Sequence, residues 1–316
     1  MDKKDLRLLE ALDGDPRMPI TALAKKIAVS PQVAAYRLNR LFEQGVLQKT
    51  AAVINLSKLG YEQYRIFFRF KNVSEAKKDE VFNYLAKHKN IYWVAKIGGQ
   101  YDLLCVVFVK TFQDYDEFLS NLHQTFPKVL QDYHAFYGVH HEYYSHKHWS
   151  KKNRTLVCGL SKVSQKMYEL DKLDRNILKV LAEDCRISSF NLGNKLGVTY
   201  KTIQNRTKKL EKQGIIEGYR IIIEDKEHPP FIVLFSYDNF DKKKETLLFH
   251  ELRENKNVTQ SIKLFGEWNL FLIVRTGSLE ELQRLIIDLR DRYDIITEHQ
   301  TIPIFKDVSI KLLPIN

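Results

Sequence analysis

Apolar positions at helical spacing open the chain. Leu6, Leu9 and Leu12 recur every three residues and place one apolar stripe on a first helix. A short second helix is expected over residues 21–27. A third is expected to begin at Ser30, a favourable N-cap residue that is followed by proline, and to end at Gly45. Three such helices with a short turn between the last two predict a helix-turn-helix.

The same pattern returns later in the chain. Residues 5–47 align without a gap on residues 174–216, at a constant separation of 169, and twelve pairs are identical. The second copy therefore predicts a helix over 189–196 and another from the cap Thr199 to Gly214. The segments VLQKTAAVINLS and IIEGYRIIIEDK follow, and their alternation predicts a β wing beside each helix-turn-helix.

The third helix of each copy has one packed face and one free face. Ala34, Leu38 and Leu41 share the packed face. Amides read adenine edges, and Lys and Arg reach guanine or phosphate, so the free face favours the DNA major groove over a merely solvated surface. The predicted DNA-binding residues are Ser30, Gln32, Tyr36, Arg37, Arg40, Thr199, Lys201, Gln204, Asn205, Arg206, Lys208 and Lys209.

Arg37 and Arg206 have two interpretations. Both border the packed face, because each lies three residues after an apolar position of that face. An ion pair with Asp5 or Asp174 on the first helix of the same copy is therefore the alternative to a phosphate contact.

A second repeated block follows each helix-turn-helix. Strands are expected at 63–70, 91–97, 101–109 and 129–137, with helices at 75–88 and 113–126, which is the βαββαβ order of a ferredoxin-like fold. The second unit predicts strands near 231–237, 257–265, 268–276 and 302–312, with helices near 241–254 and 278–291. The strands are apolar on both faces, so we expect the two copies to pack sheet to sheet as an intrachain pseudo-dimer.

The predicted fold class is therefore α+β, with winged helix-turn-helix and ferredoxin-like domains in tandem, duplicated in one chain. The expected domains are 1–55, winged helix-turn-helix 1; 61–144, ferredoxin-like ligand and dimerisation domain 1; 145–168, linker; 169–225, winged helix-turn-helix 2; and 229–316, ferredoxin-like domain 2. The linker is basic, with Lys147, Lys151, Lys152, Arg154, Lys162 and Lys166, and a solvated tether is the expected role.

The composition limits the class of partner and the compartment that we expect for this chain. The chain has 50 Lys and Arg against 39 Asp and Glu, a net charge of +11, which favours an anionic partner, either nucleic acid or a membrane surface. No apolar run approaches the roughly 18 residues needed to cross a bilayer. Three distant cysteines without CxxC spacing favour a reducing compartment. We expect a soluble cytoplasmic protein without a membrane partner.

The chain resembles two fused copies of the leucine-responsive/asparagine regulator (Lrp/AsnC) family. The resemblance rests on LDKLDRNILKVLAEDCRIS, KLGVTYKTIQNRTKKLEKQGIIEGY and the hairpin GGQYDLL, and it covers nearly all of both halves. It implies a sequence-specific DNA-binding transcription regulator whose partner is double-stranded DNA, with ferredoxin-like domains that pair into dimers and higher oligomers.

The resemblance also implies an amino-acid effector near a Gly-x-x-Asp hairpin. The matching residues are Gly99, Tyr101 and Asp102 in the first copy and Gly266, Trp268 and Asn269 in the second. Asn269 cannot act as the negative partner of an ammonium group, so the second copy departs from the family's pattern at this position. The alternative is that both glycines only permit a tight hairpin.

The sequence leaves two rival functions open. Fused pairs resembling this family also occur among sirohaem decarboxylases, which use pocket histidines, but the hairpins GGQYD and FGEWN contain none. An adaptor that has lost DNA binding is the other rival. The run HHEYYSHKH fits no standard zinc spacing, and no phosphate loop or nucleophile elbow is present. We therefore expect a non-enzyme with no metal site and no cofactor, carrying two unequal DNA-reading heads.

Overall fold

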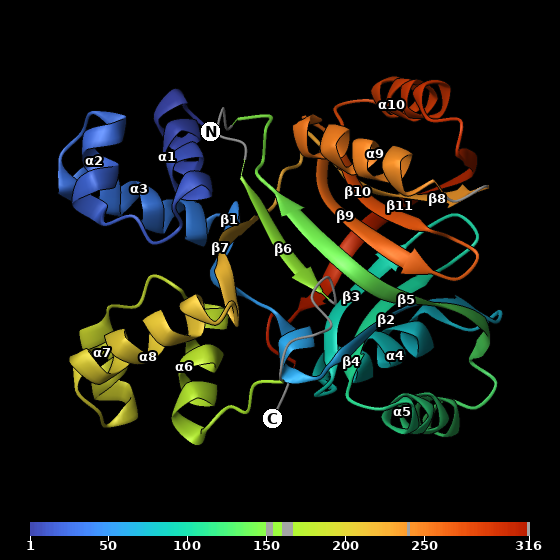
Figure 1. Ribbon diagram of the computed structural model, residues 1–316, viewed down its shortest axis with the longest axis horizontal. Helices are drawn as coiled ribbons and strands as arrows, with labels where there is room; N and C mark the ends of the chain where they lie inside the picture. The colour runs from blue at the N-terminus through green and yellow to red at the C-terminus, as the bar shows by residue number, and fades with distance from the viewer. Residues whose placement is uncertain (150–153, 160–166, 239–240, 315–316) are drawn as a thin grey trace.

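The computed structural model describes residues 1–149, 154–159, 167–238 and 241–314. Two three-helix heads lie side by side at one end of the molecule, and a β structure flanked by helices forms the other end (Figure 1). The first head holds α1 (Lys3–Gly14), α2 (Ile20–Ile27) and α3 (Pro31–Glu43). The second holds α6 (Lys172–Glu183), α7 (Ser189–Leu196) and α8 (Tyr200–Lys212).

Side-chain caps set where the recognition helices begin. The Ser30 hydroxyl accepts the Val33 N–H, and the Thr199 hydroxyl accepts the Thr202 N–H, so each satisfies a donor that the first turn leaves free. The turn before α8 uses Gly197 at φ +69°, whereas the first copy places Ala28 there at φ +53°. Both predicted helix-turn-helix units are confirmed.

The wings differ from the expected arrangement. Each copy contributes one strand, β1 (Leu47–Ile54) or β7 (Ile216–Ile223), and the two pair antiparallel with each other. Ala51 lies opposite Arg220, its own counterpart 169 residues later. An approximate two-fold axis relating the copies therefore passes between these two residues, and the wings join the heads.

Both copies have the predicted βαββαβ order. The first comprises β2 (Glu62–Phe70), α4 (Glu75–Lys87), β3 (Ile91–Ile97), β4 (Leu103–Val109), α5 (Phe112–Thr125) and β5 (Leu130–Tyr144), after a 3₁₀ turn at Leu56–Leu59. The second comprises β8 (Pro230–Tyr237), α9 (Lys242–Glu254), β9 (Val258–Phe265), β10 (Leu270–Arg275), α10 (Leu279–Arg292) and β11 (Ile296–Ile310).

The two sheets join edge to edge instead of packing face to face. Strand β3 pairs with β11, and β5 pairs with β9. Since β5 also pairs with β2, the order β2-β4-β3-β11-β8-β10-β9-β5 closes into an eight-stranded barrel. Closure gives every edge strand a hydrogen-bonding partner, which is the physical reason for this arrangement.

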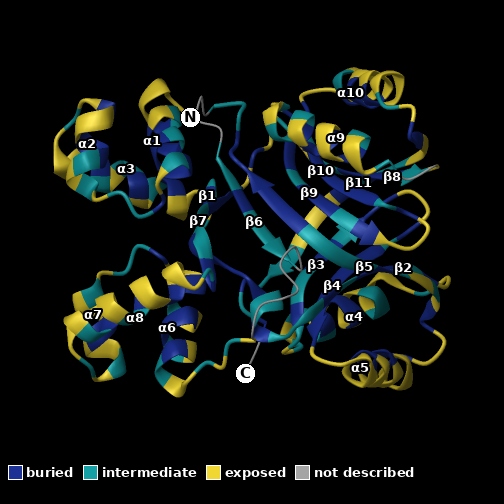
Figure 2. Ribbon diagram, in the orientation of Figure 1, coloured by how far each residue is buried: buried dark blue, intermediate teal, exposed yellow. Residues whose placement is uncertain are grey.

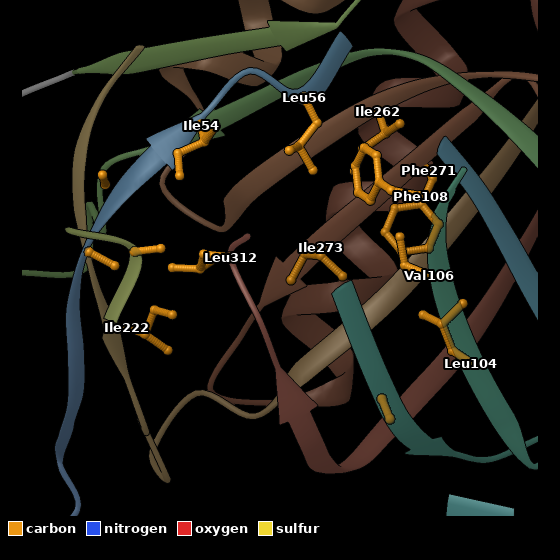
Figure 3. Close-up of a cluster of buried hydrophobic side chains, with 14 of the residues drawn as sticks. Ile54, Leu56, Leu104, Val106, Phe108, Ile222, Ile262, Phe271, Ile273 and Leu312 are labelled. Atoms are coloured by element: carbon orange, nitrogen blue, oxygen red, sulfur yellow. The ribbon is translucent and has the colours of Figure 1, made fainter. Parts of the chain in front are cut away.

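Strands that are apolar on both faces suit this barrel. Phe108, Phe271 and Ile273 belong to an interior cluster that continues to the wing residue Ile222 (Figure 3). The outward faces form two further clusters beneath the helix pairs α4/α5 and α9/α10. Figure 2 shows the strands buried under these helices, whose outer faces are exposed. The two heads therefore adjoin a β-barrel whose interior contains the first of these buried clusters.

The region between the copies differs from a free tether. Residues Thr155–Gly159 form β6, which pairs with β5. The Arg154 guanidinium donates to the carbonyl oxygen of Tyr219, and the Lys147 ammonium donates to that of Asn255 at 3.1 Å. The other basic residues of the predicted linker, Lys151, Lys152, Lys162 and Lys166, lie outside the described residues. The segment TLVCG therefore adds a strand to the sheet, whereas a solvated tether would make no such pairing.

Within the described part of the chain, no helix is long and apolar enough to cross a membrane.

Candidate DNA-reading helices and effector hairpins

Helix α8 has a strongly basic exposed face. It carries five basic side chains and one acidic one, and Lys201, Lys208 and Lys209 are exposed together with Gln204 and Asn205. Exposed amides and lysines on one helix have the chemistry that reads base edges and phosphates. The predicted residues Lys201, Gln204, Asn205, Lys208 and Lys209 therefore share one solvent-facing surface of the helix.

Two further residues of α8 escaped the sequence prediction. Tyr200 is 56% exposed, and Lys212 is also exposed. Helical spacing could have found both, because Tyr200 precedes Gln204 by four residues and Lys212 follows Lys208 by four. They extend the basic face at both ends of the helix.

Helix α3 presents a much less charged face. Gln32 and Tyr36 are exposed, and so is Asn39, which the sequence prediction omitted. The Arg40 guanidinium is 2.6 Å from the buried Asp5 carboxylate. The Arg37 guanidinium lies 2.8 Å from the other oxygen of the same carboxylate. Both basic side chains of α3 thus neutralise an internal acid.

The structure places Arg37 and Arg206 in ion pairs with the first helix of their own head. Arg37 contacts Asp2 at 2.6 Å as well as Asp5, and Arg206 contacts Asp171 at 2.5 Å and Asp174 at 3.2 Å. Hydrogen bonds from Arg37 and from the Asp5 backbone lower the pKa of Asp2 to about 2. The ion-pair interpretation is the one seen in the structure, and a phosphate contact stays a prediction.

The two hairpins use Asp102 and Asn269 in the same way. The Asp102 carboxylate accepts the Phe70 N–H at 2.8 Å, and the Asn269 side-chain oxygen accepts the Tyr237 N–H at 2.6 Å. An amide oxygen can replace a carboxylate here because only an acceptor is needed. The sequence departure in the second copy therefore preserves the hairpin while removing its charge.

The other hairpin residues are mostly packed. Tyr101 and Trp268 are buried at 3% and 7% exposure. Gly99 has φ +79° with open space around it, and Gly266 has φ +137°, where an added Cβ would approach Phe136 at 2.9 Å. Both glycines thus occupy conformations that favour glycine, which agrees with a role in permitting a tight hairpin.

The four clustered histidines have separate partners. His140 contacts Glu142 at 2.8 Å, His141 contacts Gln260 at 3.1 Å, and His146 contacts Asp13 at 3.0 Å. His148 contacts the Arg275 carbonyl oxygen at 3.1 Å. His140 and His141 belong to β5, whereas His146 and His148 follow its end, so the four side chains reach different parts of the structure.

The comparisons with known proteins agree with the fold. A winged helix-turn-helix DNA-binding family model matches residues 1–48 and 170–217. The chain is 31% identical over 118 residues to an uncharacterised HTH-type transcriptional regulator of Pyrococcus furiosus, covering 80% of that protein and 37% of this chain. It is 27% identical over 154 residues to the regulatory protein AsnC of Haemophilus influenzae, covering 99% of that protein and 45% of this chain.

A solved structure matches the entire architecture. The sirohaem decarboxylase NirDL superimposes with a TM-score of 0.64 at 13% identity, over 99% of this chain and 96% of that one. At this identity the likeness shows the fold alone. The sequence relatives, each matching about one copy, carry the family assignment. The chain belongs to the Lrp/AsnC family of DNA-binding transcription regulators, as a tandem of two units.

Proposed function

We propose that this regulator binds DNA chiefly through α8, while α3 contributes weak, largely uncharged contacts. The single observation that carries the proposal is the contrast between the two helices. The lysines of α8 are exposed, whereas Arg37 and Arg40 of α3 are paired with Asp5. Because the heads are joined through β1 and β7, two unequal heads suit an asymmetric site instead of a palindrome.

The test measures DNA affinity against salt concentration. Replacement of Lys201, Lys208 and Lys209 by alanine removes three candidate phosphate contacts, so the slope of log K against log salt should fall by about 2 to 3, at about 0.9 per contact. A matched control replaces three exposed lysines of the ferredoxin-like domains, namely Lys87, Lys89 and Lys306. An unchanged slope in the α8 variant, or an equal fall in the control, refutes the proposal.

An amino-acid effector at the first hairpin is the second part of the proposal. Asp102 is partly exposed, and one oxygen of its carboxylate accepts the Phe70 N–H. The charge is thus available to an ammonium group, whereas Asn269 offers none. Asp102→Asn keeps the hydrogen bond and removes the charge, so it should abolish any thermal shift caused by an amino acid. A shift that survives this substitution would place the effector elsewhere.

Regulation without catalysis is the favoured activity, because the sequence relatives are regulators and the decarboxylase likeness is one of fold. A purified protein that carried a tetrapyrrole absorption band, or that released carbon dioxide from sirohaem, would overturn this assignment.

Further pairing between chains is also proposed. The exposed apolar residues Leu279 and Ile287 on α10 support it, and light scattering decides between 37.2 kDa and twice that mass.

A further inference from the structure

The barrel interior contains charged side chains that its apolar walls do not explain. A cavity there is lined by Arg65 of β2, Arg220 of β7 and Arg275 of β10, with Tyr92, Tyr143 and Ile273 among its other walls. It offers about 70 Å³ to the centres of water molecules, room for about five of them. A small organic molecule therefore fits, between the wings and the barrel.

Arg65 is the most unusual of these residues. Its side chain lies over the Phe271 ring at 4.7 Å, it is 2% exposed, and its Nε and Nη1 atoms have no hydrogen-bond partner in the described structure. Burial lowers the pKa of Arg65 to about 10, which leaves it charged at neutral pH. A buried cation without a nearby anion destabilises the fold, and no described carboxylate pairs with Arg65. A bound anion would supply the missing negative partner.

The other charged groups leave the cavity positive. Among the described residues, neither Arg220 nor Arg275 lies within ion-pair distance of a carboxylate. Arg275 donates to the His228 carbonyl oxygen at 3.0 Å, and Arg220 packs over the Tyr143 ring at 4.4 Å. Asp307 is the acidic residue of the lining, and Trp93 donates to it at 2.7 Å. Asp307, with Asp225 and Glu224 from outside the lining, acts on Arg275, so the excess of about two positive charges lies at Arg65 and Arg220.

The histidines of the lining do not add to this charge balance. Burial, together with Arg65 and Arg220, holds the pKa of His141 well below its ordinary value, so that ring is neutral. His146 faces its own carboxylate, Asp13, at 3.0 Å. The excess charge therefore comes from the arginines alone.

The duplication shows that the fold does not need these arginines. The hairpins equate residues 167 apart, so Ile232 is the counterpart of Arg65 and Phe108 that of Arg275. Ala51 is the counterpart of Arg220 and faces it across the wing pair. The same structural positions are thus filled by apolar residues in the other copy, and all three cations break the symmetry around one cavity.

We propose that this cavity is a binding site for a small organic dicarboxylate, held by Arg65, Arg220 and Arg275 against apolar and aromatic walls. Guanidinium groups bind carboxylates through paired hydrogen bonds, and two carboxylates balance the excess charge. The walls formed by Tyr92, Tyr143 and Ile273 favour a carbon skeleton over an inorganic anion. The site is separate from both hairpins and takes an anion where the hairpin would take an ammonium group.

Calorimetric titration of the intact, DNA-free protein tests the site with succinate, glutarate, inorganic phosphate and acetate in chloride buffer. The dicarboxylates should bind and raise the unfolding temperature, and acetate should bind at least about tenfold more weakly. Tighter binding of phosphate than of either dicarboxylate would overturn the organic ligand. Absence of binding by every dianion at millimolar concentration would overturn the site.

Two substitutions that install the residue of the other copy sharpen the test. Arg65→Ile and Arg220→Ala should each weaken dicarboxylate binding about tenfold to a hundredfold, as expected for one charge-assisted pair. Arg65→Ile should not lower the unfolding temperature of the ligand-free protein. Arg284→Gln, a control on the exposed face of α10, should bind as the unaltered chain does. Unchanged affinity in Arg220→Ala would refute the proposal even if Arg65→Ile failed to fold.

Discussion

Glu142 connects the two copies through a fully buried carboxylate, and its replacement should be costly. Glu142 lies on β5 of the first copy, and the Arg253 guanidinium of α9 donates to its two oxygens at 2.7 and 2.5 Å. Tyr144 donates to the same carboxylate at 3.0 Å. Glu142→Gln leaves Arg253 without its anion, and because Arg253 keeps 37% exposure, the loss should be near the low end for buried pairs, about 3 kcal/mol.

The pKa of Glu142 gives a second value for the free energy that this ion pair contributes to folding. Burial opposes ionisation, but hydrogen bonds from Arg253 and His140 outweigh it and lower the pKa from 4.5 to about 2. A shift of this size corresponds to about 3 kcal/mol. Because the folded-state pKa is depressed, the stabilisation is present above pH 4.5 and is lost as the pH falls toward 2. Between pH 7 and pH 3 about 2 kcal/mol should disappear.

Urea unfolding at both pH values measures these quantities. The unaltered chain should lose about 2 kcal/mol more than Glu142→Gln between pH 7 and pH 3, because the variant has no carboxylate to protonate. Glu298→Gln, at an exposed position on β11, controls for general charge effects. A cost below about 1 kcal/mol at pH 7, or equal acid losses in both proteins, would refute the account of a buried ion pair connecting the copies.

Three smaller predictions concern local packing. Asp102→Asn should leave the unfolding temperature nearly unchanged, whereas Asp102→Ala should cost about 1 to 3 kcal/mol, because a backbone N–H loses its acceptor. Gly266→Ala should destabilise the protein more than Gly99→Ala in the same thermal assay, since only the former also crowds Phe136. Burial raises the pKa of the Cys185 thiol to about 12, so it should react with a thiol reagent only after unfolding; reaction in the native protein would contradict this.

The helices of the heads could be predicted well because their signals are local. Ser30 and Thr199 cap α3 and α8 as expected, and Gly45 and Gly214 follow them with φ near +70° and +64°. Strand β5 shows the opposite case. It was expected to end near residue 137 but continues to Tyr144, because its second half pairs with β6 and with β9 of the other copy. Pairing between distant segments leaves little trace in the local pattern.

The cavity arginines could not be recognised from a single copy. In YRIFFRF the charges at Arg65 and Arg69 look alike, yet Arg69 pairs with Asp132 at the surface and Arg65 points into the barrel. Only closure of the barrel makes residue 65 an interior position. A signal was nevertheless present, since the repeat aligns Arg65 with Ile232, and an unmatched charge at a duplicated apolar position marks a site that the fold alone does not require.

The position of Arg220 explains what a fused chain can do that a symmetric dimer cannot. Ala51 and Arg220 face each other on the pseudo-two-fold axis. In a dimer of identical chains the same residue would occupy both places, so two alanines would leave no charge there, and two arginines would repel each other at close range. Fusion permits a single cation on the axis. The same freedom lets α8 become basic while α3 uses its arginines internally, so the asymmetry of the heads and that of the cavity have a common physical origin in one covalent chain.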